Sequence, residues 1–69
     1  MTHLRVVING DEREVPAGTT LEELVVILDL AAERLAVELN LRVVRRPEWG
    51  ATPLSEGDRV EIVHFVGGG

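Results

Sequence analysis

The sequence contains no cysteine and no lysine. Without cysteine, the chain has no disulfides, thiolate zinc sites, iron–sulfur clusters or cysteine nucleophile. All seven basic residues are arginine. Schiff-base chemistry, a phosphate-binding P-loop lysine and a lysine that accepts an isopeptide bond are therefore excluded as well.

Positive charge is also scarce, because twelve acidic residues against seven arginines give a net charge of −5. An acidic chain repels the phosphate backbone, which argues against nucleic acid as a partner and favours proteins with basic docking surfaces. No apolar run approaches the roughly 20 residues that span a bilayer, and the first residues lack the pattern of a secretory signal. We therefore expect a soluble cytoplasmic protein without a membrane partner. A chain of 69 residues has room for one domain.

The N-terminal part of the sequence predicts a β-hairpin. Apolar residues alternate along residues 4–8, which is the period of a half-buried strand. Asn9-Gly10 is a strong signal for a tight hairpin turn. A second strand over about residues 11–15 is expected to run back antiparallel, and Pro16 ends its ladder because proline has no N–H group.

The strongest helix signal lies at about residues 20–29. Thr20 and Glu23 have the spacing of a capping box, in which each side chain bonds the other residue's backbone N–H group. Apolar residues follow at the helical spacing and form one stripe: Leu21, Leu24, Val25 and Leu28. Residues 30–34 fit either an extension of this helix or a turn.

The second half of the chain predicts three more strands, at residues 35–39, 42–45 and 59–66. Asn40-Leu41 forms the turn between the first two of these strands, and Leu41 is expected to avoid the left-handed conformation that asparagine tolerates. A short helical turn is expected near Pro47, ending close to Trp49-Gly50. The order of elements predicts an α+β fold in which the helix covers one face of a sheet.

The sequence offers few residues for catalysis. His3 and His64 lie near opposite ends of the chain, without the spacing of a local metal motif. No set of nucleophile, base and orienting group can be assembled, so we expect neither catalytic residues nor a metal site, and no enzyme activity. Trp49 is interpreted as a packing anchor.

The last three residues are all glycine. They are either an inert end or a functional tail, because residues without a Cβ atom can thread a channel that excludes other side chains. In the functional interpretation Gly67 and Gly68 give access, and the tail extends roughly 10 Å from the fold. It then presents a single reactive group, the α-carboxylate of Gly69.

The chain resembles the ThiS family, the sulfur carriers of thiamin biosynthesis. The resemblance covers nearly the whole sequence, and the ending is its most specific part. It is carried by these motifs: Val6-x-x-Asn9-Gly10, Gly18-Thr19-Thr20-Leu21-x-x-Leu24, Val37-x-Leu39-Asn40, Pro47-Glu48-Trp49 and the run from Glu56-Gly57-Asp58 to Gly69.

This resemblance implies a ubiquitin-like β-grasp domain over residues 1–66, followed by a flexible tail at 67–69. The implied fold is a mixed sheet of four to five strands with one main helix packed on one face. It also implies that an ATP-dependent activating enzyme, which itself uses ATP and Mg²⁺, adenylates the Gly69 carboxylate. A persulfide sulfur donor then converts the adenylate to a thiocarboxylate, which delivers its sulfur to thiazole synthase. The carrier itself needs no cofactor.

Other functions remain open at this stage. Carriers for molybdopterin or for tRNA thiolation share the terminal glycines and the chemistry. A non-covalent β-grasp binding module would have an inert tail, and a protein modifier would join Gly69 to other proteins.

The β-grasp resemblance implies that the first and last strands are neighbours, so apolar residues on their outer sides suggest one docking patch for the activating enzyme. Val7 lies opposite the apolar face of the first strand, and Val63 and Phe65 lie opposite the core face of the last. Exposed apolar patches often mark interaction sites. The alternative is a bulge that turns Phe65 into the core.

Overall fold

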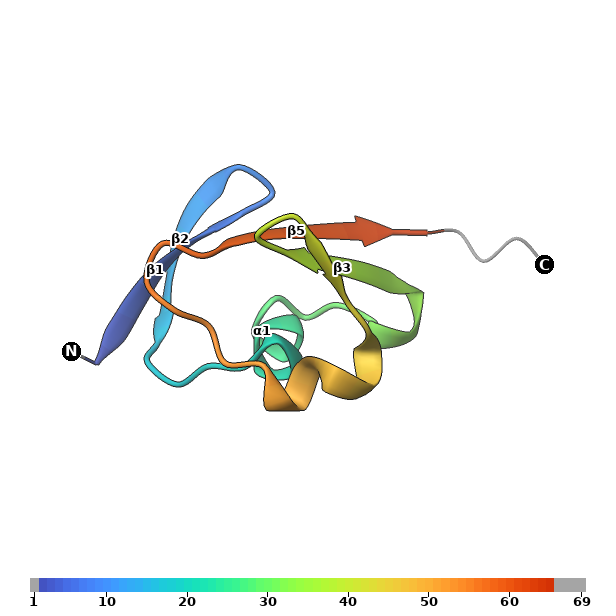
Figure 1. Ribbon diagram of the computed structural model, residues 1–69, viewed down its shortest axis with the longest axis horizontal. Coiled ribbons are helices and arrows are strands. Elements are labelled where there is room, and N and C mark those ends of the chain that lie inside the picture. The colour runs from blue at the N-terminus through green and yellow to red at the C-terminus, as the bar shows by residue number, and fades with distance from the viewer. Residues whose placement is uncertain (1, 66–69) are drawn as a thin grey trace.

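The computed structural model describes residues 2–65, which form a five-stranded sheet with one α-helix and two short 3-10 helices (Figure 1). The elements are, in order, β1 (His3–Ile8), β2 (Asp11–Pro16), α1 (Leu21–Ile27), η1 (Ala32–Arg34), β3 (Leu35–Leu39), β4 (Arg42–Val44), η2 (Arg46–Ala51) and β5 (Arg59–His64).

The sheet is mixed, and its strands follow the order β2-β1-β5-β3-β4. The two hairpins are antiparallel, and β5 lies between them, parallel to β1 and antiparallel to β3. Helix α1 and η2 lie on one side of this sheet (Figure 1). The predicted α+β class and mixed sheet are therefore confirmed, and the last strand of the chain occupies the centre of the sheet.

Helix α1 begins with the predicted capping box. The Thr20 Oγ1 accepts a hydrogen bond from the Glu23 N–H at 3.1 Å, and the Glu23 Oε1 accepts one from the Thr20 N–H at 2.9 Å. These bonds occupy N–H groups that a helix start would otherwise leave without partners.

The helix ends at Ile27, earlier than the predicted limit near residue 29. Asp29 has a φ of +58°, its N–H donates to the Val26 carbonyl, and the Leu30 N–H donates to the Val25 carbonyl. This pair of bonds is a Schellman motif, which terminates a helix through one left-handed residue. Residues 30–34, which the sequence fitted either to a helix extension or to a turn, thus lie outside α1, and Ala32–Arg34 form η1.

Both hairpin turns have positive φ at their two central residues. Asn9 and Gly10 have φ of +50° and +89°, as the Asn-Gly signal predicts. Asn40 and Leu41 have φ of +51° and +70°, so the expectation that Leu41 avoids this region is wrong. A two-residue loop must match the right-handed twist of the paired strands, and this requirement prevails over the preference of the Leu41 backbone.

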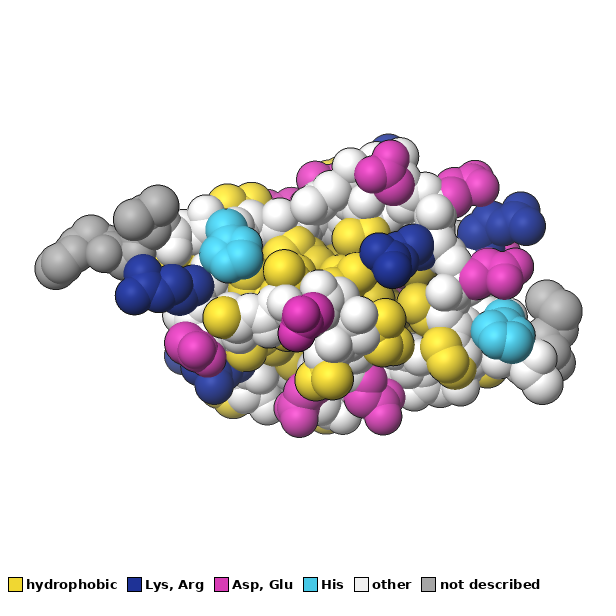
Figure 2. All heavy atoms as spheres, turned by 180° about the vertical axis from the view of Figure 1, so that it is seen from behind, with side chains coloured by type: hydrophobic (Ala, Val, Ile, Leu, Met, Phe, Trp, Pro, Cys, Tyr) yellow, Lys and Arg dark blue, Asp and Glu magenta, His cyan; other side chains and the backbone are white. Residues whose placement is uncertain are grey.

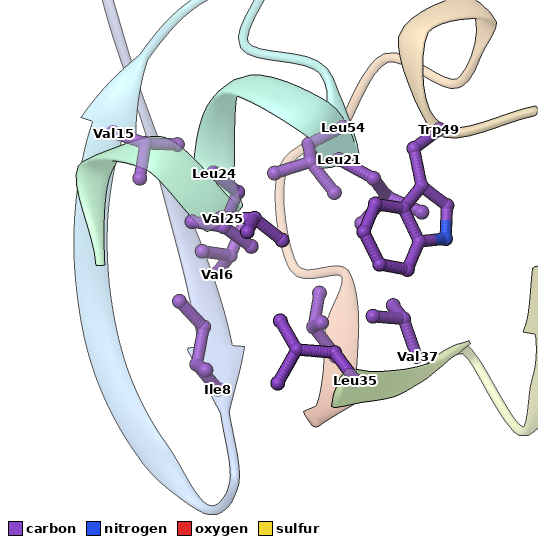
Figure 3. Close-up of a cluster of buried hydrophobic side chains, with 11 residues drawn as sticks. Val6, Ile8, Val15, Leu21, Leu24, Val25, Leu35, Val37, Trp49 and Leu54 are labelled. Atoms are coloured by element: carbon purple, nitrogen blue, oxygen red, sulfur yellow. The ribbon is translucent and has the colours of Figure 1, made fainter. Parts of the chain in front are cut away.

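The core lies between α1 and the inner face of the sheet (Figure 3). Helix α1 contributes Leu21, Leu24 and Val25, which fits the predicted apolar stripe. Trp49 is only 2% exposed, and its Nε1–H donates to the Val44 carbonyl at 2.8 Å. Its predicted role as a packing anchor is confirmed, because the indole fills the core while its polar group has a partner.

Candidate functional site

Strand β5 leads the chain toward the three terminal glycines. It is paired over much of its length, with β3 opposite residues from Val60 to His64 and with β1 opposite Arg59 and Val60. Gly67, Gly68 and Gly69, the predicted tail, lie outside the described residues, as do Met1 and Val66. The part of the candidate site within the described residues is therefore the strand that precedes the tail.

Two exposed apolar side chains lie on the outer face of the sheet at the end of β5, Val63 within the strand and Phe65 just after it. Val63 is 59% exposed and Phe65 is 48% exposed. The register against β3 runs without interruption from Val60 to His64, and the Phe65 N–H donates to the Arg34 carbonyl at 3.0 Å. The alternative of a bulge that buries Phe65 in the core is therefore wrong for this structure.

Val7 is not placed beside these two residues. Its register partner on β5 is Arg59, four residues before Val63, and its partner on β2 is Glu12. Four residues of a strand span roughly 13 Å. The residue that lies opposite Val63 is Ala36 of β3, which is also exposed. The outer face near the tail thus combines Val63 and Phe65 with Ala36, whereas Val7 lies half-buried at the other end of β5.

The histidines lie on different strands. His3 pairs with Pro16 at the start of β1, and His64 pairs with Leu35 at the end of β5. Among residues 2–65 there is no cluster of three or more histidine, aspartate or glutamate side chains that could hold a metal ion. No helix in the same part of the chain is long and apolar enough to cross a membrane.

The inner side of β5 borders an open groove of about 690 Å³. Figure 2 shows one face of the molecule on which hydrophobic side chains are exposed near the middle, with charged side chains around them. The apolar lining residues of the groove are Ile8, Leu28, Leu30 and Ile62, and its polar lining residues are Asn9, Asp11, Glu12, Arg13 and His64. The groove is open to solvent and is not an enclosed pocket for a small molecule.

Two asparagines that sequence reasoning assigned only to turns also bond to β5 or to the turn before it. The Asn9 side chain bonds both backbone groups of Ile62, and the Asn40 side chain bonds the Arg59 N–H and the Asp58 carboxylate. An asparagine at a hairpin turn indicates the turn, but nothing local in the sequence shows that its amide reaches a strand some 20 or 50 residues away.

Comparison with known proteins identifies the family. A sequence profile described as the ThiS family matches residues 6–69. The chain belongs to the ThiS family. The matched region includes Gly67, Gly68 and Gly69, so the family pattern extends through the predicted tail.

A solved ThiS structure has the same fold. The crystal structure of the thiamine biosynthesis protein ThiS from Geobacter metallireducens superimposes with a TM-score of 0.83 at 36% identity. The alignment covers 96% of this chain and 100% of that one. This similarity confirms the β-grasp fold implied by the sequence resemblance.

Relatives of two lengths match the chain. The sulfur carrier protein ThiS of Bacillus subtilis is 34% identical over 63 residues, which cover 96% of that protein. A thiazole synthase of Magnetococcus marinus is 47% identical over 66 residues, which cover 96% of this chain. The chain spans only about a fifth of that thiazole synthase, which therefore contains a ThiS-like segment within a longer polypeptide.

Proposed function

We propose that this chain is a sulfur carrier in thiamin biosynthesis and that Gly69 is its reactive residue. The observation that supports this proposal is the family match, which runs through the terminal glycines. The match to 96% of a Bacillus subtilis protein named as a sulfur carrier supports the same proposal.

The proposed chemistry begins with the Gly69 α-carboxylate, which is a poor electrophile. An activating enzyme joins the carboxylate to AMP from ATP and releases pyrophosphate, and the enzyme supplies the Mg²⁺. A persulfide then attacks the acyl carbon, so that a C–S bond forms and the bond to AMP breaks. A thiol reduces the remaining S–S bond and leaves the thiocarboxylate on Gly69. The chain itself contributes the carboxylate. Gly67 and Gly68 carry no side chains, so they allow this carboxylate to reach a narrow active site.

Thiazole synthase is the proposed acceptor of the sulfur. The Magnetococcus marinus relative is named thiazole synthase and contains a segment similar to this chain. Fusion of two proteins that act on one another is advantageous, because a covalent link raises their effective concentration. This relative also favours thiamin over the molybdopterin and tRNA-thiolation pathways.

Val63 and Phe65 are the proposed contact with the activating enzyme. Both side chains are exposed on the outer face of the strand that leads to the tail, and Ala36 extends the apolar surface on β3. An enzyme that holds the tail is brought close to this end of β5. Apolar contacts there would orient the carrier while the glycines enter the active site.

The adenylation step can be tested with a ThiS-activating enzyme, ATP and Mg²⁺. We expect pyrophosphate release that depends on this chain and that is lost when Gly69 is deleted. Deletion leaves the terminal carboxylate on Gly68, one residue short of its normal position. A Gly69→Ala variant is the matched control, because it keeps the full length of the tail and adds only a Cβ atom. Pyrophosphate release that is equal with and without Gly69 would contradict the role of Gly69. An absence of release that depends on this chain would contradict the proposal and favour a non-covalent binding module.

A further inference from the structure

Two asparagines hold β5 and the turn before it from opposite sides, in nearly the same backbone conformation. Asn9 opens the β1–β2 turn with a φ of +50°, and Asn40 opens the β3–β4 turn with a φ of +51°. The Asn9 Oδ1 accepts from the Ile62 N–H at 2.7 Å, and its Nδ2 donates to the Ile62 carbonyl at 3.1 Å. The Asn40 Oδ1 accepts from the Arg59 N–H at 3.0 Å, and its Nδ2 donates to the Asp58 Oδ1 at 3.1 Å.

The Asn9 side chain lies where β1 no longer accompanies β5. Their parallel pairing covers Val7–Arg59 and Ile8–Val60, and the Asn9 N–H then donates to the Val60 carbonyl at 2.9 Å. From Gly10 onward the chain turns back into β2. The backbone groups of Ile62 face this side, because alternate residues of a strand bond to alternate neighbours. The primary amide of Asn9 uses its oxygen as an acceptor and one N–H as a donor, as a peptide group does. It therefore makes the hydrogen bonds to Ile62 that a further residue of β1 would otherwise make.

We propose that Asn9 is a positioning residue for the C-terminal tail. Beyond Ile62, the backbone bonds that hold this part of the chain in the described residues come from β3 and then from Arg34 of η1, whose carbonyl accepts from the Phe65 N–H. Among residues 2–65, the Asn9 side chain therefore makes the last hydrogen bonds to β5 from the β1 side. By fixing Ile62 it fixes the direction in which β5 delivers the tail. This role rests on the proposed function, in which the tail enters the active site of another enzyme.

The two asparagines provide a matched pair of variants. Asn9→Gly and Asn40→Gly each remove two side-chain hydrogen bonds, and glycine adopts the positive φ of both turns without strain. The two variants should therefore lose similar amounts of stability. Only Asn9→Gly releases Ile62, which is nearer to the tail than Arg59. A third variant, Asn9→Asp, keeps the acceptor oxygen but sets a carboxylate against the Ile62 carbonyl.

Hydrogen exchange measured by NMR tests the local part of the proposal. We expect the Ile62 amide to exchange about tenfold faster in Asn9→Gly than in Asn40→Gly, after correction for global stability. Asn9→Asp should retain part of this protection through its remaining oxygen. Equal exchange at Ile62 in the two glycine variants would overturn the proposal.

Adenylation kinetics test the positioning itself. A loosely directed tail must be ordered on binding, so Asn9→Gly should raise KM for the carrier about tenfold while kcat stays within about twofold. Asn40→Gly should leave KM near the wild-type value, which separates positioning from a general loss of stability. Equal KM values for the two variants would overturn the role of Asn9 and leave the carrier function intact. A wild-type chain that forms no adenylate would overturn the proposed function and this role together.

Discussion

Replacing Leu41 by glycine should make the protein more stable, although it removes a large apolar side chain. Leu41 is 87% exposed, so its side chain contributes almost no buried area. Its φ of +70° places it in the left-handed region, which costs an L-residue about 1–2 kcal/mol. Glycine avoids this cost but loses about 0.4–1 kcal/mol through the greater freedom of the unfolded chain. The net gain should be about 0.5–1 kcal/mol in the free energy of unfolding.

Thermal and urea denaturation followed by circular dichroism would measure this gain. For a domain of this size, the predicted free energy corresponds to a Tm increase of roughly 2–8 °C. Leu41→Ala is the matched control, because it shortens the exposed side chain but keeps the Cβ atom that causes the strain. We expect Leu41→Ala to stay within about 0.5 kcal/mol of the wild type. If Leu41→Gly proves no more stable than Leu41→Ala, the reasoning from backbone strain is refuted.

Three other substitutions test the end of the helix, the core and the proposed docking surface. Asp29→Asn should stabilise the protein by about 0.3–1 kcal/mol in thermal denaturation, because asparagine keeps the left-handed C-terminal position and removes a negative charge from the negative end of the helix dipole. Trp49→Phe should cost about 2 kcal/mol in urea denaturation, because it leaves a cavity and deprives the Val44 carbonyl of its donor. Phe65→Ala should raise KM for adenylation about tenfold if the lost contact is worth about 1.4 kcal/mol. As a control, Val43→Ala truncates an exposed apolar side chain on β4 and should leave KM for adenylation unaltered.

Local signals in the sequence were sufficient for most of the fold. The alternation in β1, the Asn9-Gly10 turn and the capping box at Thr20 each depend on neighbouring residues, and all three were confirmed. The end of α1 was predicted less well, because the left-handed residue that stops it is an aspartate rather than a glycine. Composition alone did not mark Asp29 as a terminating position.

Contacts between distant segments could not be predicted from neighbouring residues. Leu41 adopts the conformation that its side chain disfavours, because the pairing of β3 with β4 imposes the turn. The predicted patch included Val7, because the resemblance to a β-grasp fold implied that β1 lies beside β5 but gave no register for the pair. The side-chain bonds from Asn9 to Ile62 cross more than 50 residues of sequence. Register and long-range side-chain bonds depend on the assembled sheet, and no single segment encodes them.

Intact-protein mass spectrometry shows whether Gly69 carries sulfur. The chain is incubated with a ThiS-activating enzyme, ATP, Mg²⁺ and a persulfide sulfur source, and fragmentation then locates any added mass. For a sulfur carrier we expect a gain of about 16 Da at Gly69, as one carboxylate oxygen is replaced by sulfur, and no gain in a variant that lacks Gly69. An unchanged mass, with an enzyme that thiolates another ThiS carrier in the same experiment, would contradict the account.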